Sequence, residues 1–528
     1  MSNTSGRARL AALDWLRLLL LLLMLIGIAF RFVNLDRKVF WHDEVYTSMR
    51  AAGYTRGEID QDLFQNRILT APDLQQYQRL KPGSNAGDTI ASLVNEDPQH
   101  PPLYFLLARF WMRIFGSSLT AVRSLPTLLS LLALPLMAGL AWELFHSRLT
   151  ALLAVALLAI SPFDILFAQT ARQYSLLTMV AIGSSYLLLR AMRLGSRAAW
   201  GLYVLSSTIG LYTHPFFGLT LLAQGSYVLL LWGWQKLRPS RTVLVVPFPA
   251  SFLAAIATTL LLYSPWIYVL LTRSGRAMAT TDWARIKVGL FYLIKLWLLS
   301  FTALFFDLDF GFDNPWTYVP RIILASLVGW GLTLICRRTD RRTWLFVLTT
   351  ILVPFLALVL PDLLLGGKRS AVSRYLISCY PGIQLAMAYL LAAGLQSGKF
   401  LWRGITALLV TGSILSCTVS ALAETWWSKD LSYFNADVIR QLNARPAPLV
   451  ICDMGSDFTN TGDLISLSYG LKPEVQFLLL GAMPRLDLGD RTPVLVWRPS
   501  PQVEDLIAKR GTRLRLISAP DRLWEVEK

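Results

Sequence analysis

Long apolar segments separated by short charged loops constrain the fold of this chain more than any other feature. The first segment, residues 13–33 (LDWLRLLLLLLMLIGIAFRFV), is long enough as a helix to cross a hydrocarbon core of roughly 30 Å. No small-residue cleavage site follows it, so we expect a retained transmembrane helix. Because 54% of the 528 residues are hydrophobic and only 16% are charged, the composition lies outside the soluble globular range. The sequence therefore predicts a polytopic α-helical membrane protein.

The basic residues indicate which loops face the cytoplasm. They give a formal net charge of +17, but they form short clusters between apolar segments, which is typical of the positive-inside rule. We therefore expect no nucleic-acid partner. The clusters share one side only if the apolar runs 100–116 and 286–306 are interfacial or re-entrant helices at the outer surface. About eleven transmembrane helices then follow a cytoplasmic N-terminus: residues 13–33, 119–142, 148–164, 173–194, 199–214, 216–235, 243–266, 318–336, 343–361, 374–396 and 401–422.

The composition changes to that of a soluble domain after about residue 424. Short β-type runs and two helical stretches occur there: residues 449–455, 475–481, 493–500, 514–518 and 523–527 for the runs, and 435–444 and 502–510 for the helices. We expect a transmembrane domain over residues 1–423, with a long outer loop at 34–118. An odd number of crossings makes residues 424–528 a small extracytoplasmic α/β domain.

Two adjacent carboxylates, Asp43 and Glu44, follow the first apolar segment in FWHDEVYTSMR (residues 40–50). Such a pair serves as metal ligands, as a general base with its helper, or merely as the solvated start of an interfacial helix. The expected topology brings further charged side chains to the same outer face from separate segments: Asp164, His100, Arg172, Lys368, Arg369 and Arg374. A single cation near the headgroup plane commonly anchors a membrane lipid. Several cations beside carboxylates instead favour transfer of a group from a phosphate to a hydroxyl or amine, because the base removes the acceptor proton while the cations stabilise the departing phosphate.

Four stretches resemble the successive landmarks of a known family. They are FWHDEVYTSMRAAGY, EDPQHPPLYFLLARFWMRIFGSS with AVRSL just beyond, SPFDILFAQTARQYSLL, and SRYLISCYPGIQLAMAYLL. Over about residues 10–425 the chain is similar to family-39 glycosyltransferases, the GT-C fold enzymes related to protein O-mannosyltransferases and to the aminoarabinose transferase of lipid A. The resemblance implies a GT-C fold, a polyprenyl-phosphate sugar donor, and inverting transfer to a lipid, polysaccharide or protein acceptor on the extracytoplasmic side.

The resemblance also implies roles for single residues. Asp43 matches the catalytic base of the family, with Glu44 as its neighbour, and His100 and Arg374 match positions near the donor phosphate. The chain departs from many relatives at Thr170, where they have Glu, so a role for an acid in this second loop is in doubt. Asp164 is the candidate for a second acid only if the turn that contains it directs its carboxylate into the site. A divalent cation, Mg²⁺ or Mn²⁺, held by the two adjacent carboxylates is left open.

A lipid or sugar-lipid transporter is the alternative function, because a transporter would also gather cations near a headgroup. It should carry ionisable residues at mid-membrane in broken helices and show related halves. The expected spans are nearly free of central charge, and no second half resembles the first. A binding or scaffold protein that displays the C-terminal domain would leave the acids and cations unexplained. The sequence therefore favours a membrane glycosyltransferase.

Overall fold

The computed structural model describes residues 2–237, 249–455, 460–486, 493–518, 520 and 522–527, with the side chains of the first helix described from residue 17 onward. The chain divides into two compact units that alternate along the sequence. We call them the helical unit (Met1–Val33, Asp97–Tyr104 and Pro126–Ala421) and the sheet unit (Asn34–Glu96, Phe105–Leu125 and Leu422–Lys528). 

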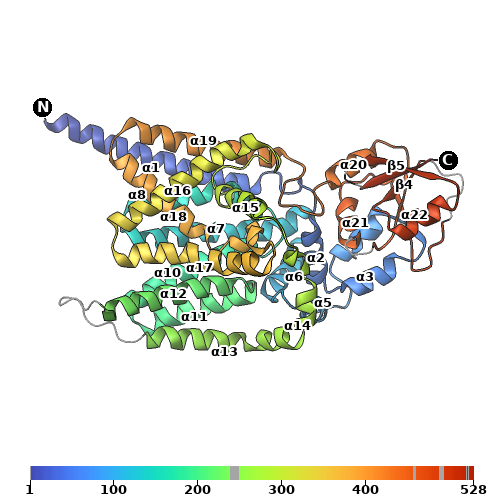
Figure 1. Ribbon diagram of the computed structural model, residues 1–528, viewed down its shortest axis with the longest axis horizontal. Helices are drawn as coiled ribbons and strands as arrows, with labels where there is room; N and C mark the ends of the chain where they lie inside the picture. The colour runs from blue at the N-terminus through green and yellow to red at the C-terminus, as the bar shows by residue number, and fades with distance from the viewer. Residues whose placement is uncertain are drawn as a thin grey trace. The chain divides into compact units, whose positions relative to one another are not determined.

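The helical unit consists mainly of long apolar helices, most of which run in roughly the same direction (Figure 1). Its helices are α1 (Ser2–Phe32), α7 (Leu119–Phe145), α8 (Arg148–Ala159), α9 (Pro162–Ala168), α10 (Tyr174–Leu194), α11 (Arg197–Thr213), α12 (Phe217–Leu237), α13 (Ala250–Thr272), α14 (Ser274–Ala279), α15 (Leu290–Thr302), α16 (Tyr318–Arg338), α17 (Arg341–Leu365), α18 (Tyr380–Gln396) and α19 (Phe400–Leu422). The first residues of α7, up to Leu125, belong to the sheet unit.

Seven helices in the described ranges are long and apolar enough to cross a membrane, and an eighth span results if the bent pair α8–α9 is counted as one. They are α7, α10, α12, α13, α16, α17 and α19. The protein is thus a polytopic α-helical membrane protein, as the apolar segments predict. Of the predicted span 243–266, residues 243–248 lie outside the described residues. The total of about eleven crossings stays a prediction.

Two of the expected spans differ from the observed helices. Residues 148–164 do not form one straight helix, because α8 ends at Ala159 and α9 begins at Pro162 with a bend of 53°. Ser161 accepts a hydrogen bond from the Asp164 N–H (3.3 Å) and so caps α9. The expected span at 374–396 also begins too early. Residues 373–376 form a 3₁₀ turn and α18 starts only at Tyr380, where Pro381 stands in the first turn, as is common at helix starts.

The two apolar runs expected to be interfacial form short helices. α6 (Leu103–Phe115) and α15 (Leu290–Thr302) have 13 residues each, which is too few to cross a hydrocarbon core. On α6 the side chains of Phe110, Ile114 and Phe115 are exposed. An interfacial location of both helices stays a prediction.

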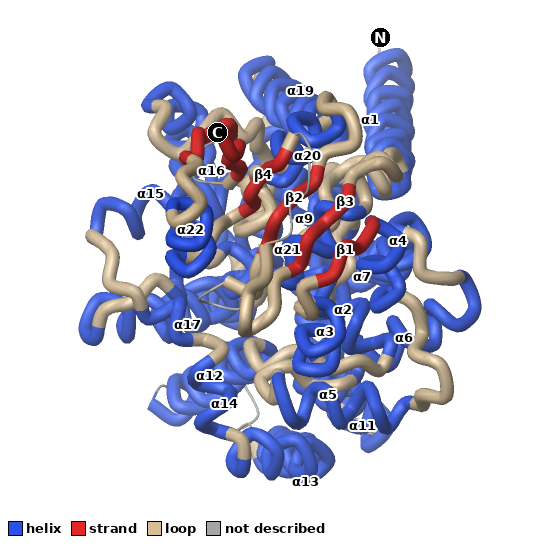
Figure 2. Tube along the Cα trace, turned by 90° about the vertical axis from the view of Figure 1, so that its right-hand side faces the viewer, coloured by secondary structure: helices blue, strands red, loops and turns tan. Residues whose placement is uncertain are grey.

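The sheet unit contains one six-stranded sheet in the order β1-β3-β2-β4-β6-β5. The strands are β1 (Arg67–Thr70), β2 (Leu449–Cys452), β3 (Gln476–Leu479), β4 (Val494–Trp497), β5 (Arg513–Ser518) and β6 (Leu523–Glu527). The central strands β3, β2 and β4 are parallel, and β1, β6 and β5 pair antiparallel with their neighbours. Figure 2 shows β1, β3, β2 and β4 side by side. All residues of β2 and β4 are buried, as their uninterrupted apolar runs require for parallel strands covered on both faces.

The helices of the sheet unit come from both ends of the chain. They are α2 (His42–Ala52), α3 (Arg56–Leu63), α4 (Ala71–Gln75), α5 (Ala86–Glu96), α6, α20 (Asn435–Asn443), α21 (Asn460–Ser468) and α22 (Pro501–Ala508). The structure therefore differs from the division at residues 423 and 424 that the sequence suggests. Strand β1 from the first outer loop pairs with β3, with Arg67 opposite Leu479, so residues 34–96 fold together with the C-terminal part.

Candidate functional site

Helix α2 carries the two adjacent carboxylates in its first turn. The helix begins at His42 because the Trp41 N–H donates to Glu44 Oε2 (3.0 Å), which satisfies one of the unpaired amides at a helix start. It ends at Gly53, whose φ of +95° is a left-handed conformation that glycine adopts without strain. Asp43 and Glu44 both lie where a carboxylate interacts favourably with the helix dipole. 

Glu44 is completely buried and anchored by a bidentate ion pair. Arg123, at the start of α7, donates from Nε to Oε1 and from Nη2 to Oε2, both at 2.9 Å. Both residues have 0% relative exposure. The other N–H groups of Arg123 donate to backbone carbonyls of the segment before α2: Leu35 (2.7 Å), Lys38 (2.9 Å) and Val39 (2.9 Å). All five guanidinium donors are thus used, and they fix the chain that enters α2.

A second cation completes the anchor. Lys429, which follows α19, places Nζ 2.7 Å from Glu44 Oε2 and is 1% exposed. Burial by itself would raise the pKa of Glu44, but the charges and hydrogen bonds of Arg123 and Lys429 outweigh it and lower the pKa to about 2. Glu44 is therefore ionised throughout the physiological pH range, and its carboxylate is held by both Arg123 and Lys429.

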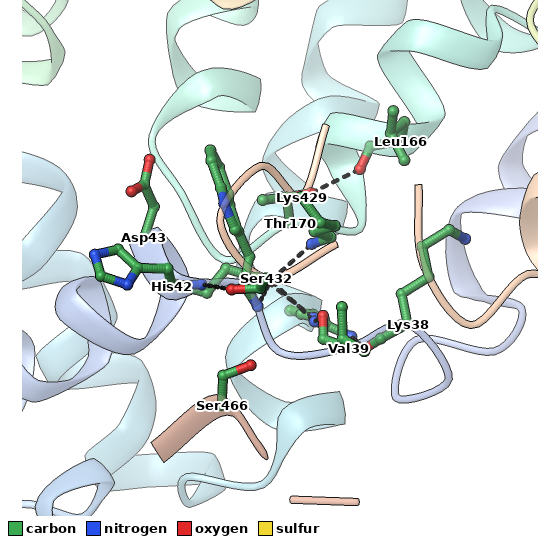
Figure 3. Close-up of polar contacts among 12 residues, drawn as sticks. Lys38, Val39, His42, Asp43, Leu166, Thr170, Lys429, Ser432 and Ser466 are labelled. Carbon is green, nitrogen blue, oxygen red and sulfur yellow. Dashed lines mark hydrogen bonds and ion pairs between the residues drawn. The ribbon is translucent and has the colours of Figure 1, made fainter. Parts of the chain in front are cut away.

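Asp43 has a different environment although it is the next residue in the chain. Adjacent helical residues point about 100° apart, so the anchoring of Glu44 directs Asp43 away from that cluster. Asp43 is partly exposed, and in Figure 3 its carboxylate points away from Ser432. The structure thus separates the two carboxylates: Glu44 acts as a buried anchor, and Asp43 is the one presented outside it.

The two carboxylates do not fit a divalent metal ion. Both Glu44 oxygens already accept hydrogen bonds from Arg123, and Oε2 also accepts from Lys429 and from the Trp41 amide. Two cations at this carboxylate would repel a further positive charge. Among the residues that the structure describes, no three His, Cys, Asp or Glu side chains come together as a ligand set. 

In the helical unit, His100 and Arg172 lie close together. Arg172 Nη2 is 3.4 Å from His100 Nε2, and Gln173 Nε2 is 3.3 Å from His100 Nδ1. The guanidinium also lies over the ring of Tyr174, 5.8 Å from its centroid. His214 is the neighbour that sequence reasoning missed, because its place before Pro215 reads as a simple helix end. The rings of His100 and His214 are 6.1 Å apart.

The cations near residue 370 divide into two kinds. Arg374 and Lys368 both lie over the ring of Trp283, at 5.7 and 5.4 Å from its centroid, and both are partly exposed. Arg369 instead pairs with the buried Asp362 at 3.1 Å. The same carboxylate accepts the Ser370 N–H (2.6 Å), so Arg369 is part of a local structural network.

Aromatic contacts connect these two groups of cations within the helical unit. Phe216 packs against His214 at 5.2 Å and against Tyr375 at 4.2 Å between ring centroids. Arg374 lies over the ring of Tyr375 at 5.7 Å. The helical unit therefore brings most of the predicted phosphate-binding residues into one continuous region, and Arg369 is the exception.

Asp164, the candidate second acid, lies inside the helical unit. It is 8% exposed, and its Oδ2 accepts a hydrogen bond from Gln384 Nε2 (2.8 Å). The turn therefore directs it to α18. Thr170 likewise uses its hydroxyl locally, donating to the Leu166 carbonyl at 2.9 Å.

Sequence reasoning also missed Arg123 and Lys429. Arg123 lies within AVRSL, one of the stretches that carries the family resemblance, and a charged residue in the first turns of an apolar helix is a signal in itself. Lys429 has no comparable signal, because it lies 385 residues from its partner Glu44.

Comparisons with known proteins agree with this architecture. Residues 99–269 match the family model described as dolichyl-phosphate-mannose-protein mannosyltransferase. No curated protein sequence matches the chain. Among solved structures, the chain is similar to ArnT from Cupriavidus metallidurans bound to undecaprenyl phosphate, with 13% identity, a TM-score of 0.54, and coverage of 97% of this chain and 98% of ArnT. ArnT in the apo state gives 13% identity, a TM-score of 0.54, and 98% coverage of each chain.

A further similar structure is the oligosaccharyltransferase of Archaeoglobus fulgidus in the apo form, with 12% identity, a TM-score of 0.46, and coverage of 86% of this chain and 64% of that one. The likeness to ArnT over nearly the whole of both chains shows that the fold is of the GT-C type. The chain is thus similar in fold to ArnT and, over residues 99–269, similar in sequence to the mannosyltransferase family model.

Proposed function

We propose that this chain is a multi-pass membrane glycosyltransferase that transfers one sugar from a polyprenyl-phosphate donor to an extracytoplasmic acceptor. The family match and the GT-C fold support transfer of a glycosyl group. The solved ArnT structure contains undecaprenyl phosphate, which supports a polyprenyl phosphate as the lipid carrier. The transferred group is a hexosyl or pentosyl residue, and the acceptor is a lipid, a polysaccharide or a protein.

The proposed reaction is a single inverting displacement. The acceptor oxygen or nitrogen attacks C1 of the sugar and forms a bond to it, while the bond from C1 to the phosphate oxygen breaks and its electron pair stays on the phosphate. Asp43 takes the acceptor proton, and cationic side chains of the helical unit compensate the charge that collects on the leaving polyprenyl phosphate. We assign this second role to Arg374, Arg172 and Lys368, with His100 beside Arg172. No step requires a metal ion.

The observation that carries the proposal is the contrast between the two carboxylates of α2. A general base must be ionised and accessible, and Asp43 is the partly exposed member of the pair. Glu44 is enclosed by Arg123 and Lys429 and cannot approach an acceptor without leaving two cations behind. Asp43 is therefore the base, and Glu44 holds the helix that presents it.

The test compares Asp43→Asn with Asp164→Asn in transfer from a polyprenyl-phosphate sugar. Asn keeps the shape of Asp but cannot take the proton, so Asp43→Asn should lower kcat by roughly 10² to 10⁴ while donor binding stays nearly intact. Asp164→Asn is the matched control, because Asp164 bonds only within the helical unit, and its kcat should stay within about threefold. Near-normal turnover of Asp43→Asn would remove the mechanism, and wild-type protein without transfer would remove the function.

We also propose the orientation that the basic loops indicate, with a cytoplasmic N-terminus and residues 424–528 outside. The native cysteines allow a direct test, because Cys336 is exposed near the end of α16, whereas Cys379, Cys417 and Cys452 are buried. An impermeant thiol reagent applied to intact cells should leave Cys336 unlabelled. In a Cys336→Ser background it should label a cysteine introduced at the exposed Glu474. The opposite labelling pattern would invert the orientation.

A further inference from the structure

The segment that follows α19 contacts the first turn of α2 at two points within the sheet unit. Lys429 Nζ is 2.7 Å from Glu44 Oε2. Three residues further on, the hydroxyl of Ser432 accepts the His42 N–H at 2.9 Å, as Figure 3 shows, and it donates to Asp463 of α21. The residues on both sides of Asp43 are thus bonded to the C-terminal part of the chain.

Helix α21 packs so closely on side chains of α2 that a Cβ atom at the contact would force those side chains to shift. A Cβ atom at Gly462 would lie 2.7 Å from His42 Nδ1 and 2.6 Å from a ring carbon of Tyr46, both too short for a stable contact. Asp463, the next residue, is fully buried and its Oδ2 accepts from Arg498 Nη1 at 3.0 Å. The C-terminal part therefore packs directly on the helix that bears the proposed base.

We propose that Lys429 is a positioning residue for Asp43: its ammonium group completes the buried anchor of Glu44 and thereby fixes the first turn of α2. The proposal deepens the proposed function and rests on it, since positioning concerns Asp43 as the base. Lys429 acts through Glu44, the residue that follows Asp43 in α2. A misplacement of a catalytic group by about 1 Å costs on the order of 100-fold in rate, so a modest change in this anchor has a measurable consequence.

Burial makes the anchor sensitive to alkaline pH. Desolvation lowers the pKa of Lys429 to about 8, with Arg123 acting in the same direction and with Glu44 and Asp43 opposing the shift. The ring of Trp41 also faces the ammonium group, at 5.9 Å. As the pH rises through about 8, Lys429 loses its proton and no longer offers Glu44 a positive charge, while the ion pair with Arg123 remains. We expect the turnover of the wild-type enzyme to fall in the same range.

The experiment measures transfer from a polyprenyl-phosphate sugar by full-length purified protein between pH 6.5 and 9.5. Lys429→Met should lower kcat by about 100-fold, with a much smaller change in the KM for the donor, and its residual activity should lack the fall near pH 8. Lys429→Arg keeps a charge that does not titrate in this range, so its activity should persist above pH 8. Lys81→Met is the matched control, because Lys81 forms an ion pair with Glu58 at the surface of the same unit, and its rate and pH profile should equal those of the wild type.

A double mutant tests whether Lys429 acts through Glu44. If it does, Glu44→Gln combined with Lys429→Met should be no slower than Glu44→Gln alone, within about threefold, because the second change removes a contact that is already lost. A multiplicative loss in the double mutant, or wild-type kcat and pH profile in Lys429→Met, would overturn the proposal. If Lys429→Met does not fold, the pH profile of Lys429→Arg tests the proposal instead. A fall in its activity near pH 8 equal to that of the wild type would contradict the proposal. Active wild-type protein in these assays separates this outcome from failure of the proposed function.

Discussion

The charged residues around Glu44 in the sheet unit and the cations over Trp283 in the helical unit are held in different ways. In the sheet unit, Glu44, Arg123 and Lys429 are almost fully buried and bonded to one another. In the helical unit, Arg374 and Lys368 are partly exposed and lie over an aromatic ring. Buried charges bonded to one another maintain a local structure, whereas partly exposed cations that lie over a ring are accessible to an anionic ligand.

The same distinction applies between neighbours in sequence. Asp43 and Glu44 are adjacent, yet Glu44 is enclosed and Asp43 is partly exposed. Lys368 and Arg369 are adjacent as well, yet only Arg369 is paired with the buried Asp362. Residue type and position alone therefore do not distinguish a chemical role from a structural one. The interaction partner of each charged side chain distinguishes them.

The largest expected effect comes from breaking the buried anchor. Arg123→Met removes two hydrogen bonds to the buried carboxylate of Glu44 and the donors to three backbone carbonyls, so we expect a loss of about 3–5 kcal/mol in the free energy of unfolding. Thermal unfolding of the purified protein in detergent measures it. Arg67→Met is the matched control, because the Arg67–Asp62 pair is about half exposed on both sides and should contribute at most about 1 kcal/mol. Equal stability of the two variants would contradict the distinction between anchoring and exposed charges.

The long apolar runs of the sequence predicted most helices of the helical unit, because a membrane span is a local signal of some twenty residues. The C-terminal strands were predicted for the same reason, since each is a short apolar run. Strand β1 was missed, because the four residues RILT at 67–70 carry no strand pattern and gain their structure from pairing with β3. The pairing of β1 with β3 joins the first outer loop to the C-terminal part. A domain boundary placed near residue 424 from composition alone does not detect such a pairing.

The candidate site was predictable in its residue types and less so in its partners. The family resemblance indicated Asp43, His100 and Arg374, and the structure brings His100 together with Arg172. The roles of Arg123 and Lys429 depend on contacts with Glu44 over 79 and 385 residues of sequence. Such pairs leave no periodic pattern, so only the folded chain distinguishes the anchored carboxylate from the presented one.

The smaller expected effect tests the stacked cations of the helical unit. Arg374→Ala should weaken use of the donor by about 2 kcal/mol, because a charge-assisted contact to phosphate in a partly dehydrated site has that magnitude. Since its guanidinium lies over Trp283 and Tyr375 near the surface, the unfolding temperature should change little. Arg369→Ala provides the contrast, because it removes the partner of the buried Asp362. Its main effect should be a lower unfolding temperature and not a higher donor KM. Donor KM and kcat/KM for both variants, measured beside their thermal unfolding, decide the matter. If Arg374→Ala uses the donor as well as the wild type does, Arg374 only anchors a lipid headgroup, and stacking on a ring does not identify the phosphate site.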